Sequence, residues 1–439
     1  MNVVLPKELA YVPSLPSLPE CLSQEVVLSP VNGSVFNAGQ LLQFDLVARG
    51  FIDPASIYLR YKVSLTNTST QASKMKGTPV YTYFNKLETI FGSSVVESVN
   101  QYNQVCNMMT NLQFNVAQKY GQQINYGWSI GSSASLTPSL EQLDGRICSN
   151  NEVFSLAAPL PCILSMAERF IPAGLMPNIR IQLTTASIAE AFVNENLPTN
   201  YALSNVELCY TMVDFSGDTN ELVKNMGDQF YIKSTSFKNM GASLASGVSG
   251  SVDLIYNMRL ASIKSLFTHF CGQNATACAN GLFDSIDPTS GNGELVYNIA
   301  GTSYPTRPVS TLNSKASVMC ELKKAVGALH SVEYNTSINS VEFSHTDYSV
   351  LATTNSAGTT ITPVPTSLYT SGKFIFSCNT EKLSSSNTVL SGISTQSSPI
   401  SLRISTNTAT LQAYNVYLVA MYDCLIQVNP HERNASVKE

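Results

Sequence analysis

The stretch Ser56-Ile-Tyr-Leu-Arg-Tyr-Lys-Val-Ser-Leu65 has apolar residues at every second position. Successive side chains of a β-strand point to opposite faces, so the alternation places five apolar side chains on one face: Ile57, Leu59, Tyr61, Val63 and Leu65. A strand with one apolar face lies between a core and solvent. The stretch therefore predicts a half-buried strand.

The same period of two recurs in both halves of the chain. It predicts further strands on the sets Leu42/Phe44/Leu46, Ile179/Ile181/Leu183, Val206/Leu208/Tyr210/Met212 and Val252/Leu254/Tyr256/Met258/Leu260. The segment Val416–Tyr422 is apolar on both faces, which is typical of a strand enclosed between two layers. Strand patterns outnumber helical patterns, so we predict an all-β protein.

Two segments have helical periodicity instead. Ser98-x-x-Gln101 matches a capping box and precedes a stripe that predicts a helix over 99–116, formed by Tyr102, Val105, Cys106, Met109, Leu112 and Val116. A second helix is predicted over 314–329, with the stripe Val318, Leu322, Ala325, Val326 and Leu329. We interpret both stripes as core packing beneath a sheet. The helices are short connections between strands.

Four short landmarks occur twice, in the same order and about 206 to 223 residues apart. They pair Ala55-Ser-Ile57 with Ala261-Ser-Ile263, Ile90-Phe-Gly-Ser-Ser94 with Ile299-Ala-Gly-Thr-Ser303, Ile179-Arg-Ile181 with Leu402-Arg-Ile404, and Asn205-Val-Glu-Leu208 with Asn415-Val-Tyr-Leu418. Chance matches rarely keep both order and spacing. The duplication predicts two homologous β domains in tandem.

The 439 residues allow two to three domains at roughly 150 residues each. Turn-forming residues at Ser216-Gly-Asp-Thr-Asn220 place the boundary near residue 217. Prolines 13, 16 and 19 argue against regular strand pairing before the first domain. We therefore expect an N-terminal arm over 1–23, a first domain over 24–217, a second domain over 218–429 and a C-terminal tail over 430–439.

The charge balance is mildly acidic, with 25 Lys and Arg against 30 Asp and Glu, and only 13% of residues are charged. Residues 1–30 contain Lys7 as their one basic residue, whereas binding to a phosphate backbone needs clustered Lys and Arg. We therefore expect no direct sequence-specific binding to nucleic acid. A low charge content is also typical of surfaces that end up against other protein.

No stretch approaches roughly 18 consecutive apolar residues, and the start has neither a basic segment nor an apolar segment of a signal peptide. We expect a protein made and kept in the cytosol or nucleus. The ten cysteines are spread without any C-x-x-C pair, at 21, 106, 148, 162, 209, 271, 278, 320, 378 and 424. This spacing favours free, buried thiols over disulfides.

A search for catalytic chemistry finds no G-x-S-x-G, no phosphate-binding G-x-x-x-x-G-K-[ST] and no H-E-x-x-H. The four histidines, His269, His330, His345 and His431, are scattered, and we interpret each as structural or exposed. The pairs Asp284/Asp287 and Asp214/Asp218 are interpreted as turn residues, and Tyr304-Pro-Thr-Arg-Pro308 as a rigid extended turn before a helix. We predict no catalytic residue, no cofactor site and no metal site, so we do not expect an enzyme.

The chain resembles the double jelly-roll major capsid proteins of the adenovirus–tectivirus lineage, and is most similar to those of polinton-like viruses and virophages. The resemblance rests on Ile52-Asp-Pro-Ala-Ser-Ile-Tyr-Leu-Arg-Tyr-Lys-Val63, Phe84-Asn-Lys-Leu-Glu-Thr-Ile-Phe-Gly-Ser-Ser-Val-Val-Glu97, Gln101-Tyr-Asn103, Val296-Tyr-Asn-Ile-Ala-Gly301 and Tyr304-Pro-Thr-Arg-Pro308. It implies two tandem jelly rolls, each an eight-stranded β-sandwich.

The resemblance further implies a major capsid protein that forms pseudo-hexagonal homotrimeric capsomers, which tile an icosahedral viral shell. Its partners would be neighbouring capsomers, minor capsid, penton and cement proteins and, as in some relatives, an internal viral membrane. It would reside in the virion after synthesis and assembly in the host cytoplasm or nucleus. The loops at 128–151, 268–293 and 352–373 are candidates for outward towers.

An alternative function is glycan binding by a tandem β-sandwich, as in a viral fibre or a lectin. It rests on scattered aromatic residues such as Tyr120, Tyr126 and Trp128, whose rings would stack on sugars. A third hypothesis is a β-sandwich hydrolase whose site converges from distant residues. Self-association, selective glycan binding and substrate turnover are the observations that separate the three.

Overall fold

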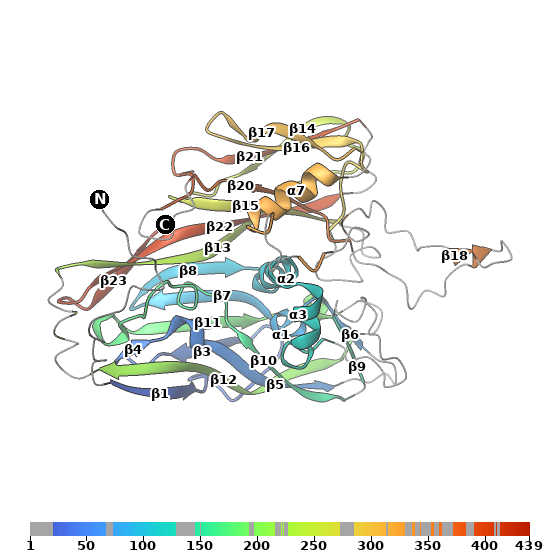
Figure 1. The fold of residues 1–439 in the computed structure, drawn as a ribbon. Helices are drawn as coiled ribbons and strands as arrows, with labels where there is room; N and C mark the ends of the chain where they lie inside the picture. Colours follow the sequence, from blue (N-terminus) through green and yellow to red (C-terminus); the bar gives the residue numbers. More distant parts are fainter. Residues whose placement is uncertain are drawn as a thin grey trace, which may run out of the picture.

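A computed structural model describes residues 21–439 with internal gaps. The residues left out are 67–72, 129–144, 150, 193–196, 216–220, 222, 224–226, 273–284, 313–314, 330–335, 339–342, 344–352, 355–359, 362–371, 383–389, 408–409 and 411–412. The described chain is mainly β-structure, arranged as two stacked units (Figure 1). The predicted all-β class is confirmed.

The first unit contains two antiparallel sheets. One has the strand order β1 (Cys21–Leu28), β12 (Asn200–Phe215), β5 (Tyr58–Thr66) and β10 (Val153–Pro159), and β12 also pairs with the short strands β2 (Val35–Phe36) and β4 (Phe51–Ile52). The other has the order β3 (Leu41–Asp45), β11 (Ile179–Thr185), β7 (Phe84–Phe91) and β8 (Ser94–Asn100). The apolar faces of these two sheets supply the core.

The second unit repeats this arrangement. Its first sheet has the order β13 (Phe230–Leu244), β22 (Tyr414–Asn429), β15 (Ile263–Gly272) and β20 (Ile375–Asn379), and β23 (Asn434–Lys438) also pairs with β22. Its second sheet has the order β14 (Gly250–Tyr256), β21 (Ile400–Thr406), β16 (Gly293–Ile299) and β17 (Thr302–Ser310). Each unit therefore has two four-stranded paths with the same sequence of crossovers.

Two small ladders and several helices complete the described structure. The ladders are β6 (Ser73–Met75) with β9 (Arg146–Cys148) and β18 (Thr353–Thr354) with β19 (Thr360–Ile361). The helices are α1 (Pro79–Thr82), α2 (Tyr102–Gln113), α3 (Val116–Gly121), α4 (Gln123–Tyr126), α5 (Ile188–Ala191) and α7 (Ala316–Ala325), with 3-10 turns at Pro54–Ser56 and Ala173–Leu175. α2 follows β8 and α7 follows β17, so the duplication extends to the longest helices.

The predicted landmarks occupy equivalent places in the two units. The Gly92 and Gly301 landmarks form the β7–β8 and β16–β17 hairpin turns, where both glycines have a positive φ. Of the other pairs, one lies directly before β5 and at the start of β15, one lies in β11 and β21, and one lies in β12 and β22. A shared strand order and shared landmarks confirm the predicted duplication.

The predicted strand faces are also confirmed. The five alternating apolar residues of the predicted strand, Ile57 just before β5 and four within it, are between 0% and 4% exposed. In β22, the consecutive residues Leu418, Val419 and Ala420 are all buried, as expected for a strand that is enclosed on both faces. This strand lies between β13 and β15 and runs through the middle of its sheet.

The predicted capping box at Ser98 is wrong. Ser98 belongs to β8, where it pairs with Glu88 of β7, and the residue before the helix is Gln101 in the left-handed region. Strand pairing continues to Asn100 because the β7 ladder outcompetes a local cap. The helix therefore begins at Tyr102 rather than at residue 99.

The ends of the chain differ from simple tails. β1 begins at Cys21, within the expected arm, and residues 434–438 of the expected tail form β23 against β22. Residues 216–220, where the domain boundary is predicted, lie outside the described residues. The division near residue 217 stays a proposal.

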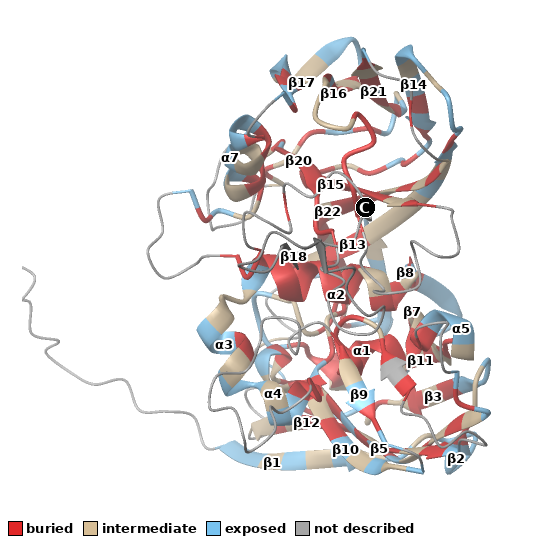
Figure 2. Ribbon diagram, turned by 90° about the vertical axis from the view of Figure 1, so that its right-hand side faces the viewer, coloured by how far each residue is buried: buried red, intermediate tan, exposed pale blue. Residues whose placement is uncertain are grey.

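The two units meet along edge strands. β8 ends the second sheet of the first unit, β13 begins the first sheet of the second unit, and the two strands lie side by side (Figures 1 and 2). No backbone ladder joins them among the described residues, so side chains make the contact. We call this contact, with the turn 160–168 beside it, the seam.

Candidate functional site

The structure places the described histidines apart from one another. His269 lies in β15 and is buried, with Nε2 3.1 Å from Gln104 Oε1, and burial lowers its pKa to about 3. It is therefore neutral near pH 7. His431 is exposed after β22, whereas His330 and His345 lie outside the described residues. The part of the chain that is described contains no group of three potential metal ligands.

The aspartates of the two predicted pairs have structural partners where they are described. Asp287 is buried, accepts from Thr289 N and Oγ1 at 2.9 and 2.6 Å, and lies 3.3 Å from Lys315 Nζ. Asp214 in β12 lies 3.4 Å from Arg49. Asp284 and Asp218 are outside the described residues. The turn interpretation holds for Asp287, which also pairs with a buried lysine, and it is wrong for Asp214, which lies in strand β12.

The segment Tyr304–Pro308 is part of strand β17 rather than a separate turn. It lies at the open edge of its sheet, where the ladder to β16 is interrupted between Leu295 and Tyr297. Pro305 and Arg307 line a shallow pocket together with Ser317 and Glu321 of α7. The extended shape was predictable, but the edge-strand position needs the sheet order.

The aromatic residues proposed for sugar stacking are mostly inside the fold. Trp128 is 0% exposed and Tyr126 is 6% exposed. Their rings stack on each other, with centroids 5.1 Å apart and planes 5° apart. Two buried rings that face each other offer no surface to a glycan, so the glycan-binding alternative is not favoured.

The most unusual buried group is Glu97 of β8, which is 2% exposed at the seam. Its carboxylate accepts from Thr89 Oγ1 at 2.8 Å, from the Ile163 amide at 3.0 Å to each oxygen, and from the Ser236 hydroxyl of β13. Ser234 of β13 also donates to the Ile163 carbonyl oxygen. One carboxylate thus joins β7, the turn 160–168 and the second unit.

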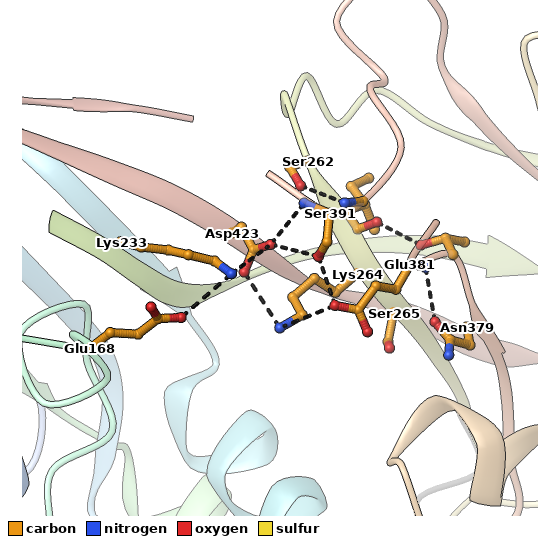
Figure 3. Close-up of polar contacts among 12 residues, drawn as sticks. Glu168, Lys233, Ser262, Lys264, Ser265, Asn379, Glu381, Ser391 and Asp423 are labelled. Carbon is orange, nitrogen blue, oxygen red and sulfur yellow. Dashed lines mark hydrogen bonds and ion pairs between the residues drawn. The ribbon is translucent and has the colours of Figure 1, made fainter. Parts of the chain in front are cut away.

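A charged cluster extends the seam (Figure 3). Asp423 of β22 is fully buried, and its oxygens lie 3.9 Å from Lys233 Nζ and 3.5 Å from Lys264 Nζ. Ser391 donates to Asp423 through its hydroxyl at 3.0 Å. Lys233 also reaches Glu168 of the first unit at 3.4 Å. We call these five residues the ionic cluster, and it ties the second unit to the turn 160–168.

The described residues thus form no constellation of nucleophile, base and open cavity. The polar groups that are concentrated at the seam hold the two units of the chain together. In the same described part, no helix is long and apolar enough to cross a bilayer. These hydrogen bonds and ion pairs fix the two sandwiches in one orientation and leave their outer sheets and edge strands exposed at the surface.

Comparison with known proteins gives a consistent result. No protein-family model matches the chain, and no curated protein sequence is significantly similar to it. The Faustovirus major capsid protein is similar in structure with a TM-score of 0.61, at 6% identity, over 96% of this chain and 92% of that chain. A chain of the PBCV-1 virus capsid gives a TM-score of 0.60, at 9% identity, over 98% and 99% of the two chains. The mavirus major capsid protein gives 0.54, at 9% identity, over 100% and 95%.

The chain has the double jelly-roll fold. In this double jelly roll, each four-stranded path of the first unit has its counterpart in the second. The expected eight-stranded sandwiches are therefore present twice.

The thiols of the double jelly roll provide a direct test of its packing. Nine of the ten cysteines are described as free thiols, Cys278 being outside the described residues. Cys21 and Cys320 are exposed, whereas burial raises the pKa of Cys148 and of Cys162 to about 12.

We expect a maleimide to label Cys21 and Cys320 rapidly in the folded protein. Cys148 and Cys162 should react at least roughly a hundredfold more slowly, because they are shielded and have little thiolate. Peptide mapping by mass spectrometry after timed labelling measures this difference, and urea-unfolded protein, in which all thiols react, is the control. Rapid labelling of Cys162 in the folded state would contradict the packing of the turn 160–168.

Proposed function

We propose that the protein is a major capsid protein that self-assembles as pseudo-hexagonal homotrimeric capsomers of an icosahedral viral shell. The observation that carries this proposal is the double jelly-roll fold over nearly the whole chain, which it shares with proteins whose described role is a major capsid protein.

The internal duplication supports a trimer. β17 is the counterpart of β8, and β1 is the counterpart of β13, because the strands of each pair occupy the same end of corresponding sheets in the two units. β8 and β13 meet in the seam, whereas within the described chain no strand pairs with the outer edges of β17 and β1. A ring that repeats the seam contact places β17 of one copy against β1 of the next. Three copies, with two units each, close a ring of six.

Strand register identifies the residue on β1 that corresponds to the seam. Ser236 of β13 pairs with Tyr422 of β22. The landmark shift between β22 and β12 makes Met212 the counterpart of Tyr422, and Met212 pairs with Gln24 of β1. Gln24 therefore occupies the position in the first unit that Ser236 occupies in the second.

The hairpin glycines identify the other side in the same way. Glu97 follows Gly92 in β8 as Thr306 follows Gly301 in β17, at the same spacing. Thr306 is exposed in the single chain. In the proposed ring, Thr306 of one copy lies opposite Gln24 of the next, as Glu97 lies opposite Ser236 within the chain.

The remaining parts of the proposal follow from this role. Its partners are neighbouring capsomers and minor capsid, penton or cement proteins, with an internal viral membrane beneath the shell as a further partner. It resides in the virion after synthesis in the host cytoplasm or nucleus. The tower candidates 128–151 and 352–373 lie largely outside the described residues, as do residues 273–284 of the candidate 268–293, whereas residues 268–272 belong to strand β15 rather than to a loop.

Mass photometry of the purified protein tests the oligomeric state. We expect a particle of three times the 47.5 kDa chain mass at low concentration, and closed shells or hexagonal arrays by electron microscopy at high concentration. The physical reason is that the open edges of β17 and β1 are covered only in the ring. Persistent monomers at every concentration would contradict the capsomer.

Cross-linking tests the proposed ring contact. In a background with Cys21→Ser and Cys320→Ser, the pair Gln24→Cys and Thr306→Cys should be joined between copies by a short bis-maleimide, giving linked trimers on a denaturing gel. The matched control replaces Thr306→Cys by Ile255→Cys, at a site that is 68% exposed on β14, and should give no ladder. A trimer by mass without the cross-link would mean that the copies meet through other edges.

A further inference from the structure

We propose that Glu97 links the packing of the two units to proton binding, so that the seam holds most tightly when this side chain is protonated and weakens when it ionises. The inference concerns a contact inside one chain, and it does not depend on the proposed role in a capsid. It starts from the position of Glu97, which is buried between edge strand β8 of one unit and edge strand β13 of the other.

The neighbours of Glu97 provide hydrogen bonds but no opposite charge. Thr89, the Ile163 amide and Ser236 all donate to it, and among the described residues no ion pair joins it to a lysine, arginine or histidine. Burial of an unpaired carboxylate is costly, because water no longer solvates the charge. Three neutral donors recover only part of that cost.

The charged and titratable groups on the surrounding elements do not supply the missing cation. The negative charge of Glu439, which follows β23, raises the pKa of Glu97. The charge of Glu97 in turn raises the pKa of Cys106 of α2, Cys162 of the turn 160–168, and Tyr422 and Cys424 of β22. The nearby lysines are engaged elsewhere. Lys233 pairs with Glu168 and Asp423, Lys238 pairs with Glu439, and Lys86 of β7 pairs with Glu88.

The balance of these effects has a definite direction. Burial raises the pKa of Glu97 above its ordinary value of 4.5, the hydrogen bonds from Ile163, Ser236 and Thr89 oppose this, and the negative charge of Glu439 adds to it. Folding therefore binds a proton more tightly at Glu97 than the unfolded chain does.

The consequence for stability follows from that sign. The contribution of a group whose pKa is raised by folding is fully present below the ordinary value of 4.5, and it is lost as the pH rises through the raised pKa. Within this window, each pH unit weakens the folded state by up to roughly tenfold in its equilibrium constant. The weakening is concentrated at the seam, because Glu97 contacts both units.

Glu97→Gln is the direct test, because glutamine keeps the shape and cannot ionise. Unfolding midpoints in urea, measured from pH 4.5 to pH 8.5, should fall more steeply for the wild type than for Glu97→Gln. Glu88→Gln is the matched control, since Glu88 lies in the adjacent strand β7 and has Lys86 as its partner. That control should keep the wild-type slope.

If Glu97→Gln fails to fold, two measurements on the wild type and on Ser236→Ala still test the proposal. Infrared spectra of the wild type should show one carboxylic acid band that persists above pH 4.5 and that is stronger in Ser236→Ala, which removes a donor to the anion. Hydrogen exchange, corrected for intrinsic rates, should accelerate with pH in peptides from β8 and β13. Equal slopes in wild type and Glu97→Gln, or no protonated carboxyl above pH 4.5, would overturn the proposal.

Discussion

Asp423→Ala is expected to lower the free energy of unfolding by about 3–5 kcal/mol, the usual cost of removing one partner from a buried charge cluster. Asp423 is fully buried, and it lies between the ammonium groups of Lys233 and Lys264. Its removal leaves Lys233, which is 8% exposed, with Glu168 alone, and it also removes one of the two acceptors of the Ser391 hydroxyl, the other being Glu381. Urea unfolding monitored by fluorescence measures the change.

Two further variants serve as controls for this prediction. Asp423→Asn keeps an oxygen for Ser391 but loses the charge, so it should fall between the wild type and Asp423→Ala. Asp253→Ala removes an exposed aspartate from β14 and should change the free energy of unfolding by less than about 0.5 kcal/mol. A loss below about 1 kcal/mol for Asp423→Ala would mean that the ionic cluster is solvated and contributes little.

Leu208→Ala and Leu418→Ala are each expected to cost about 2–5 kcal/mol, because each deletes a fully buried side chain from the central strand of its sheet. The two leucines are counterparts in the duplicated landmarks, so they form a matched pair across the units. Ile255→Ala, at a residue that is 68% exposed, is the control and should be nearly neutral.

The shape of the unfolding curve adds a second observable. If the seam couples the units, either leucine variant should shift one common transition rather than split it. Calorimetry of Leu208→Ala and of Leu418→Ala checks this. Two separate transitions, each sensitive to one variant, would show that the units unfold independently and that the seam is weak.

Periodicity in the sequence is sufficient to predict the strands that pack on a core. In β5 and β11, the apolar residues alternate without interruption, because each strand has one face toward the core. The duplication is also visible in the sequence, since hairpin turns such as those at Gly92 and Gly301 need residues that tolerate a positive φ.

The seam could not be predicted in the same way. Glu97 follows Val95 and Val96 in a strand where regular alternation would place it with the exposed Val95. The ladder between β7 and β8 shifts register at this point, so that Val96 and Glu97 are both buried. A β-bulge of this kind depends on pairing with the partner strand, so the local sequence of β8 does not predict it.

The partners of the buried charged residues also could not be predicted from the sequence. Lys233 and Asp423 are almost two hundred positions apart, and a lysine in a strand ordinarily suggests an exposed face. Ser98 shows the opposite error, since a local motif that fits a helix cap belongs to a strand in the folded chain. In both cases, long-range pairing decides the outcome.

The edges of the two second sheets are protected from unwanted association in different ways. β8 has no proline and is covered by β13, whereas β17 stands open and contains Pro305 and Pro308, which lack the amide hydrogens that a continuing ladder would need. A protein present in many copies risks amyloid-like stacking wherever a sheet edge stays bare. In the proposed ring, the prolines would let β17 meet the next copy through side chains while preventing a continuous intermolecular sheet, so assembly at this edge would end in a closed, finite object.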